Sequence, residues 1–306
     1  MPAIVVEDLS KDYGAVAAVR GLSFTVEEGE VFAVVGPNGA GKTTTVEILE
    51  GHRKRTSGAV SVLGFDPETG GRAYRERIGI VLQEAGIDEE FTPRELVRLY
   101  SGFYPRPRRV DEVIDLVGLA TKQDARVKTL SGGQRRRVDL ALGLIGDPDL
   151  IFLDEPTTGF DPAARRRAWE VVGNLCAVGK TVLLTTHYME EARQLADRVA
   201  VVAAGQLVAI GTPGELVGAS HGSGGMITFE LPASIAVDAL PDVGERLTVV
   251  DGIVEVRSAA PTRDLRALTG WAVDRDLELP ALSIAPPSFE DAYLELIGRV
   301  EGAGRA

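Results

Sequence analysis

The sequence predicts an α/β fold that carries a helical insert and is followed by a small α+β domain. Short β-branched runs alternate with helical patterns before residue 220, which is typical of a largely parallel sheet covered by helices. Residues 92–146 keep helical spacing throughout, and a glycine- and serine-rich stretch at 220–225 resembles a linker. We therefore expect one domain over residues 1–221, with a helical subdomain at about 87–146, and a second domain over residues 222–306.

The first strands are predicted where apolar and β-branched residues cluster between turn residues, at 4–9, 22–26, 31–35, 59–63 and 78–82. The insert opens with Thr92, Pro93 and Glu95, the pattern of a capped helix start with proline in the first turn. After the insert, strands are predicted at 150–153, 181–185, 199–202 and 207–210, and helices at 163–178 and 188–196. This alternation of strands and helices is the reason for the α/β prediction.

The C-terminal part has a different pattern. Residues 247–250 and 253–256 flank Asp251-Gly252, a two-residue hairpin signal, while residues 261–268 and 288–297 have helical spacing. Strands paired by a short turn, together with separate helices, predict an α+β unit.

Composition restricts the classes of partner. The 306 residues include 33 basic and 45 acidic side chains, a net charge of −12, and this field repels nucleic acid phosphates. The single cysteine cannot form an intramolecular disulfide, which favours a cytoplasmic location. No apolar run approaches the roughly 18 residues of a membrane span, so any spans must come from partner subunits.

A glycine-rich segment lies between the apolar run 31–35 and a predicted helix, and it fits the phosphate-binding pattern G-x-x-x-x-G-K-[ST]. Glycines allow backbone N–H groups to surround phosphate oxygens, the lysine reaches the terminal phosphates, and the threonine hydroxyl can bind Mg²⁺. A chance glycine-rich turn is the alternative, but the flanking strand and helix make it improbable. The expected nucleotide-binding residues are Gly36, Pro37, Asn38, Gly39, Ala40, Gly41, Lys42, Thr43 and Thr44, with Thr43 also a metal ligand.

Two adjacent carboxylates end the uncharged run at 150–153. Asp154 is expected to hold Mg²⁺, and Glu155 is expected to act as the general base that orients and deprotonates water. An ordinary acidic turn is the alternative; it loses weight because a phosphate-binding loop precedes it on another strand.

The segment 130–134, Leu-Ser-Gly-Gly-Gln, opens a helix that continues through three arginines. Ser131 and Gln134 are spaced as a capping box, so a well-capped helix is the simpler interpretation. The glycine pair, however, costs helix stability and is explained if the backbone must lie against a ligand. Here the sequence resembles the ATP-binding cassette family, whose members use this segment to close over the nucleotide of the opposite subunit. The resemblance implies that Ser131, Gly133 and Gln134 bind that ATP.

The resemblance also assigns roles to four further residues. It implies that Tyr13 stacks on adenine, although a surface tyrosine is the alternative, and that Gln83 contacts both Mg²⁺ and water. Asp161 matches the acidic residue of the loop across the dimer axis, although it can equally cap the next helix. His187 matches the histidine that contacts the γ-phosphate; this assignment depends on its order after the other motifs.

The family resemblance implies a P-loop NTPase cassette with a mixed sheet and a β-rich N-terminal subdomain. It also implies a homodimer that shares two ATP molecules, Mg²⁺ as cofactor, and an ATPase on the inner face of the membrane, bound to membrane-spanning permease subunits. The segment 289–296 resembles the C-terminal part of daunorubicin-resistance exporter ATPases, which indicates a drug or antibiotic exporter. A soluble cassette ATPase of the cluster-assembly, translation or repair type is the alternative.

Overall fold

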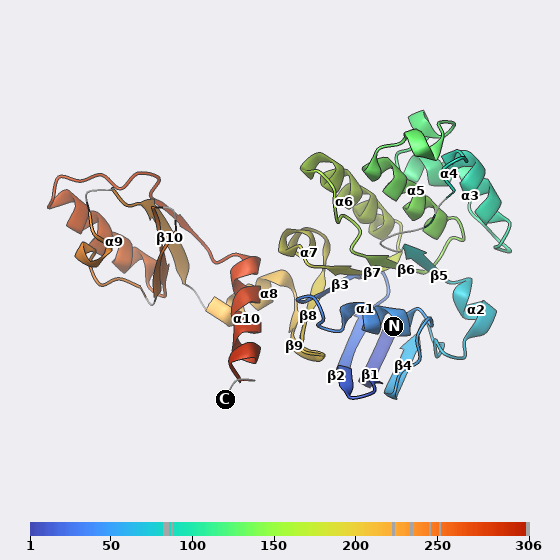
Figure 1. Cartoon of the computed structure of the whole chain (residues 1–306), viewed down its shortest axis with the longest axis horizontal. Helices are drawn as coiled ribbons and strands as arrows, with labels where there is room; N and C mark the ends of the chain where they lie inside the picture. Colours follow the sequence, from blue (N-terminus) through green and yellow to red (C-terminus); the bar gives the residue numbers. More distant parts are fainter. Residues whose placement is uncertain are drawn as a thin grey trace. The chain divides into compact units, whose positions relative to one another are not determined.

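A six-stranded sheet organises the first of two compact units, residues 1–213, in the computed structural model (Figure 1). The structure describes residues 1–81, 86, 88–221, 224–232, 235–244, 246–250 and 252–303. Strands β5, β6, β7, β3 and β8 run parallel in that order, and β9 joins β8 antiparallel, so the sheet is mixed. Their bounds are Ile78–Val81, Leu150–Asp154, Thr181–Thr186, Val31–Val35, Arg198–Ala203 and Gln206–Gly211. The predicted α/β class is thereby confirmed.

Three neighbouring strands of this sheet end at the same level. Asp154 of β6 pairs with Thr185 of β7, and Val35 of β3 pairs with Thr186. All of β3 and most of β6 are buried, because apolar side chains on a central parallel strand face covering layers on both sides. The polar residues that follow these strands therefore meet at one edge of the sheet, where parallel α/β folds place their ligands.

An antiparallel sheet in the order β2-β1-β4 forms a second layer, made of Val16–Glu27, Pro2–Tyr13 and Ser57–Val62. Helix α1, Lys42–Leu49, lies between this sheet and the larger one (Figure 1). The shared core includes Phe24, which stacks on Phe32 with ring centroids 5.4 Å apart. This packing attaches the N-terminal sheet directly to the strand that leads into the glycine-rich segment.

Helices cover the face of the large sheet opposite α1 (Figure 1). The insert contributes α3 (Pro93–Ser101), α4 (Val110–Leu116), two short 3₁₀ turns and α5 (Gly132–Leu144). Helices α6 (Pro162–Ala177) and α7 (Met189–Leu195) follow β6 and β7, and the short α2 (Gly71–Arg75) precedes β5. The helical insert expected from the sequence is therefore present.

The second unit, residues 214–306, has its own sheet and core. Its strands run in the order β11-β12-β10-β13, with bounds Arg246–Val250, Ile253–Ser258, Gly225–Glu230 and Ser283–Ala285. Helix α9, Pro261–Val273, packs against one face through Leu268 and Ala272. Helices α8 (Pro213–His221) and α10 (Phe289–Ala303) complete it. The antiparallel β11–β12 pair agrees with the predicted hairpin.

The structure divides the chain after residue 213, whereas the sequence led us to expect a domain boundary after residue 221. Residues 220 and 221, which belong to the glycine- and serine-rich stretch predicted as a linker, end α8. The expected domain limits stay a prediction until each part is expressed alone. Within the described residues, no helix is both long enough and apolar enough to cross a membrane.

Candidate phosphate site and signature cavity

The glycine-rich segment joins β3 to α1 in a tight loop. Gly41 caps α1 with φ of 97°, a left-handed conformation that favours glycine. A Cβ atom there would lie 2.5 Å from the Ala18 carbonyl oxygen, and one on Gly36 would lie 2.1 Å from the Val202 carbonyl oxygen. Both positions therefore require glycine because the loop packs directly on neighbouring backbone.

Lys42 is held inside this loop. Its side chain is buried, and Nζ donates to the carbonyl oxygens of Gly36 at 2.8 Å and Pro37 at 3.2 Å. Burial lowers the pKa of Lys42, while the nearby carboxylates of Glu155 and Asp154 act in the opposite direction. Next to it, Thr43 is exposed at the first turn of α1. The lysine thus lies within electrostatic reach of both predicted acidic residues.

Asp154 and Glu155 emerge at the end of β6 in different environments. The Asp154 carboxylate accepts a hydrogen bond from Thr185 Oγ1 at 2.5 Å, which fixes one of its oxygens. Glu155 has φ of 45°, an unusual conformation for a residue with a side chain, and its N–H is 3.1 Å from the Thr185 carbonyl oxygen. Its carboxylate accepts from Thr158 Oγ1 at 3.0 Å. Asp154 is anchored to the sheet, whereas Glu155 belongs to a turn.

His187 follows β7 and faces Glu155. Its Nδ1 atom lies 3.1 Å from Glu155 Oε1, and its ring packs on Tyr188 with centroids 4.1 Å apart. The His187 side chain keeps 39% of its surface exposed, so it can still reach a ligand above the sheet edge. Lys42, Asp154, Glu155 and His187 therefore surround one site.

Metal binding at this site is consistent with its donor atoms. The Thr43 hydroxyl and the Asp154 carboxylate are oxygen donors, the type that Mg²⁺ prefers. Mg²⁺ usually takes one or two protein carboxylates and completes its coordination with substrate phosphates and water. Gln83, the third expected ligand, lies outside the described residues.

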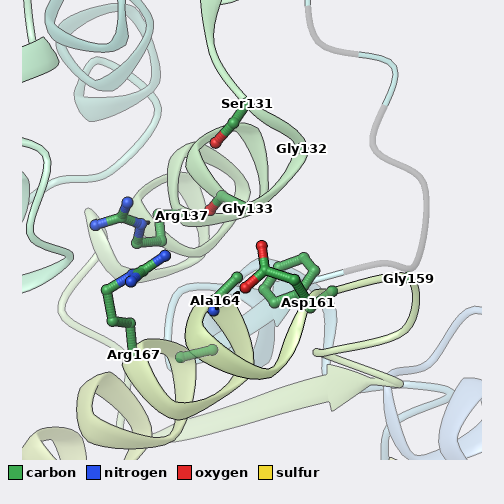
Figure 2. A pocket seen from close by; sticks show the side chains of 10 residues that line it. Ser131, Gly132, Gly133, Arg137, Gly159, Asp161, Ala164 and Arg167 are labelled. Carbon is green, nitrogen blue, oxygen red and sulfur yellow. Dashed lines mark hydrogen bonds between the residues drawn. The ribbon is translucent and has the colours of Figure 1, made fainter.

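A cavity of about 160 Å³ lies between the N-terminal ends of α5 and α6 (Figure 2). Ser131 caps α5, and its side chain and that of Gln134 form the reciprocal hydrogen bonds of a capping box, which confirms that interpretation. Asp161 caps α6 by accepting from the N–H groups of Ala163 and Ala164 at 2.9 and 2.8 Å. The structure thus brings the expected Ser131, Gly133 and Asp161 to one cavity, whose lining also includes Arg137 and Arg167.

Tyr13 lies at the end of β1, 41% exposed, with Lys11 Nζ and the Arg53 guanidinium 5.1 and 5.3 Å from its ring centroid. This partly exposed ring is compatible both with base stacking and with an ordinary surface role. The cavity between α5 and α6, here called the signature cavity, is lined neither by Tyr13 nor by the phosphate loop. The cavity and the phosphate site are therefore separate within one chain.

Sequence reasoning missed several residues that hold the site together. Thr185 and Thr158 bind the two carboxylates, and Arg136 of α5 donates to backbone carbonyls of the Glu155 turn. Glu191 of α7 is fully buried and accepts from Thr157 Oγ1 at 2.8 Å. These contacts join residues far apart in the sequence, and only the polar run Thr185-Thr186-His187 at the end of an apolar strand gave any signal.

Comparisons with known proteins show the family of the chain. Residues 19–158 match the ABC transporter family, and residues 225–288 match the ABC transporter domain-containing protein-like C-terminal domain. The chain is 39% identical to the Nod factor export ATP-binding protein I of Rhizobium meliloti over 97% of its length and 88% of the relative. It is also 39% identical to the daunorubicin resistance ATP-binding protein DrrA3 of Streptomyces coeruleorubidus, covering 97% and 96% of the two chains.

Solved structures give the same result. The cbiO1 subunit of a Clostridium perfringens ABC transporter complex superposes with a TM-score of 0.65 at 27% identity, over 70% of this chain and 90% of that one. Another ATP-binding subunit of an ABC transporter gives 0.63 at 28% identity, over 70% and 91%. The chain belongs to the ATP-binding subunits of ABC transporters, which confirms the family and the function that the sequence indicated.

Proposed function

We propose that this chain hydrolyses ATP to ADP and phosphate and uses the reaction to drive export through separate membrane subunits. One observation carries the proposal: the ends of β3, β6 and β7 gather a phosphate loop with a buried lysine, two carboxylates and a histidine at one sheet edge. Phosphoryl transfer needs mainly positioning and charge stabilisation, and these groups supply both.

The binding roles follow from the groups present. Backbone N–H groups of residues 36–44 and the N-terminal end of α1 would surround the phosphates, and Lys42 would exchange its carbonyl partners for β- and γ-phosphate oxygens. Thr43 and Asp154 would hold Mg²⁺, with Gln83 as the further expected ligand. When bound, Mg²⁺ neutralises charge on the β- and γ-phosphates.

Glu155 is the proposed general base that acts on water. In the proposed reaction the water oxygen forms a bond to the γ-phosphorus, Glu155 takes the water proton, and the bond from the γ-phosphorus to the bridging oxygen breaks to release ADP. The hydrogen bond from Thr158 and the proximity of His187 restrict the Glu155 carboxylate to a small range of orientations. His187 would contact the γ-phosphate.

Two copies are needed to complete each site. The phosphate site and the signature cavity are separate in one chain, so we propose a head-to-tail homodimer in which Ser131, Gly133 and Gln134 contact the ATP held by the partner. Asp161 would lie at the contact between the two copies. Tyr13 would stack on the adenine of the ATP bound in the same copy.

The partner and cargo are inferred from relatives. Nod factor export and daunorubicin resistance are named for two relatives, and we propose that this chain serves an exporter of a drug-like or antibiotic molecule. It would work on the inner face of the membrane through permease subunits. Phe91, Tyr100 and Phe103 of the helical insert are exposed and offer a docking surface for these subunits.

The test is phosphate release by the purified full chain with ATP and Mg²⁺, alone and after co-expression with the candidate permease. Hydrolysis that depends on Lys42 supports the ATPase proposal, and stimulation by a candidate cargo supports export. Hydrolysis that is the same in Lys42→Ala and unmodified protein contradicts the assignment of the site.

A further inference from the structure

A guanidinium from α5 holds the backbone on both sides of Glu155. Arg136 Nη2 donates to the carbonyl oxygen of Asp154 at 2.9 Å, and Arg136 Nε lies 3.4 Å from the carbonyl oxygen of Pro156. Glu155 itself has φ of 45°, a conformation that costs free energy in a residue with a Cβ atom and persists when neighbouring contacts enforce it. A single side chain thus contacts the two carbonyls that flank the strained residue.

Arg136 keeps its charge although it is largely buried. Its side chain is 12% exposed, and burial lowers its pKa, while Asp139, Asp154 and Glu191 act in the opposite direction. Asp139 Oδ2 lies 3.9 Å from Nη1, one helical turn along α5. The planar guanidinium presents several N–H donors in a fixed arrangement, which allows it to bond two carbonyls at once. A lysine could keep the charge but could not reproduce this double contact.

The same turn is fixed on its other side by α6 and α7. Glu191 Oε1 accepts from Thr157 Oγ1 at 2.8 Å and from Trp169 Nε1 at 3.0 Å, and Glu191 is fully buried. Because these bonds do not involve Arg136, the turn keeps part of its support when the guanidinium is replaced. A change at Arg136 should therefore shift the Glu155 carboxylate without unfolding the surrounding structure.

We propose that Arg136 is a positioning residue for Glu155. Its contacts with the Asp154 and Pro156 carbonyls orient the Glu155 carboxylate toward the water that attacks the γ-phosphate. This inference rests on the proposed role of Glu155 as general base. It assigns Arg136 no contact with ATP, so its effect should fall on the chemical step and not on nucleotide binding.

The test is a double-mutant cycle in the full-length chain. Arg136→Lys is measured in the unmodified and in the Glu155→Gln background by single-turnover hydrolysis of labelled ATP, which resolves slow rates. We expect Arg136→Lys to lower the rate about tenfold to a hundredfold when Glu155 is present, with ATP affinity unchanged. In the Glu155→Gln background, Arg136→Lys should leave the hydrolysis rate nearly unchanged, a ratio of about one, because no base remains to be positioned.

Arg135→Lys is the matched control. Arg135 neighbours Arg136 on α5, but it bonds Glu89 Oε1 and the Lys128 carbonyl, away from the Glu155 turn. It should change the rate less than twofold in either background. Thermal unfolding of each variant checks that Arg136→Lys is folded. If Arg136→Lys does not fold, the cycle is repeated with Arg136→Gln, which keeps N–H donors without the charge.

Each outcome decides the inference. Equal rate losses from Arg136→Lys in both backgrounds, a loss confined to ATP affinity, or an unchanged rate in the Glu155-containing protein would overturn the positioning role. Failure of the proposed function itself looks different: Glu155→Gln alone would then leave hydrolysis undiminished.

Discussion

His187 Nδ1 lies 3.1 Å from Glu155 Oε1, which places the proposed base directly beside the residue expected to touch the γ-phosphate. The two residues directly follow the neighbouring strands β6 and β7, which end at the same level because Asp154 pairs with Thr185. When the imidazole is protonated, this distance allows an ion pair, and when it is neutral, Nδ1 can donate a hydrogen bond to the carboxylate. Either contact limits where Glu155 can direct its free oxygen.

Lys42→Ala should abolish tight ATP binding or turnover. The substitution removes a buried charge that is held by the Gly36 and Pro37 carbonyls and faces the phosphate position. We expect at least about a tenfold loss of ATP affinity or hydrolysis, measured by calorimetry and phosphate release. Lys122→Ala, at an exposed position in the insert, is the control and should match the unmodified chain.

Glu155→Gln should slow hydrolysis by about a hundredfold or more while ATP stays bound, since the amide keeps the size of the carboxylate but cannot accept the proton. ATP that binds only the closed dimer then stabilises it by mass action. Light scattering with ATP and Mg²⁺ should show a shift from monomer to dimer. Adding Ser131→Arg should remove that shift, because a bulky cation would obstruct the glycine backbone at the cavity. A dimer that persists in the double variant argues against shared sites.

Tyr13→Ala should weaken ATP binding and leave the rate per bound ATP nearly unchanged. The exposed ring offers stacking area for the base and has no contact with the reacting phosphate. We expect about a threefold to tenfold rise in the dissociation constant. Tyr13→Phe keeps the ring and should bind as the unmodified chain does. If the unmodified chain, Tyr13→Ala and Tyr13→Phe bind ATP with equal affinity, Tyr13 is an ordinary surface residue and does not stack on the base.

Asp139→Asn should stabilise the first unit at neutral pH. Burial raises the pKa of Asp139 to about 6, against the opposing effect of Arg136, while the unfolded value is 3.8. Since the folded chain binds this proton more tightly, the carboxyl favours folding below about pH 4, and this contribution is lost as the pH rises to about 6. The variant should gain about 1 to 3 kcal/mol of unfolding free energy at pH 7.5, and less at pH 5. The comparison is urea unfolding beside Asp115→Asn, an exposed control. A gain that does not change with pH would contradict the assigned cause.

Much of the site could be predicted because its geometry is encoded locally. The capping boxes at Thr92 and Ser131 are formed as the residue types indicated, since every partner lies within three residues. The roles assigned to Tyr13, Gln83, Asp161 and His187 stay predictions until variants are measured.

The sequence was less informative where contacts cross the fold. Strand β1 extends over Pro2–Tyr13, beyond the predicted 4–9, because its outer residues pair with β2 through irregular register that interrupts the alternating pattern. The bond from Arg136 to the Asp154 carbonyl spans 18 residues, and the one from Thr157 to Glu191 spans 34. Such pairings depend on packing between helices and leave no periodic signal in the chain.

The close approach of Gly41 to the Ala18 carbonyl has a consequence for nucleotide choice. Ala18 belongs to β2, whose neighbour β1 ends at Tyr13, so the glycine-rich loop packs on the same antiparallel sheet that carries the Tyr13 ring. In the proposed binding mode, this sheet would fix the span between a base stacked on Tyr13 and the phosphates bound in the loop. Stacking depends on ring area and accepts any nucleobase. The chain should therefore discriminate weakly between ATP and GTP, and strongly against inorganic tripolyphosphate, which lacks one end of that span.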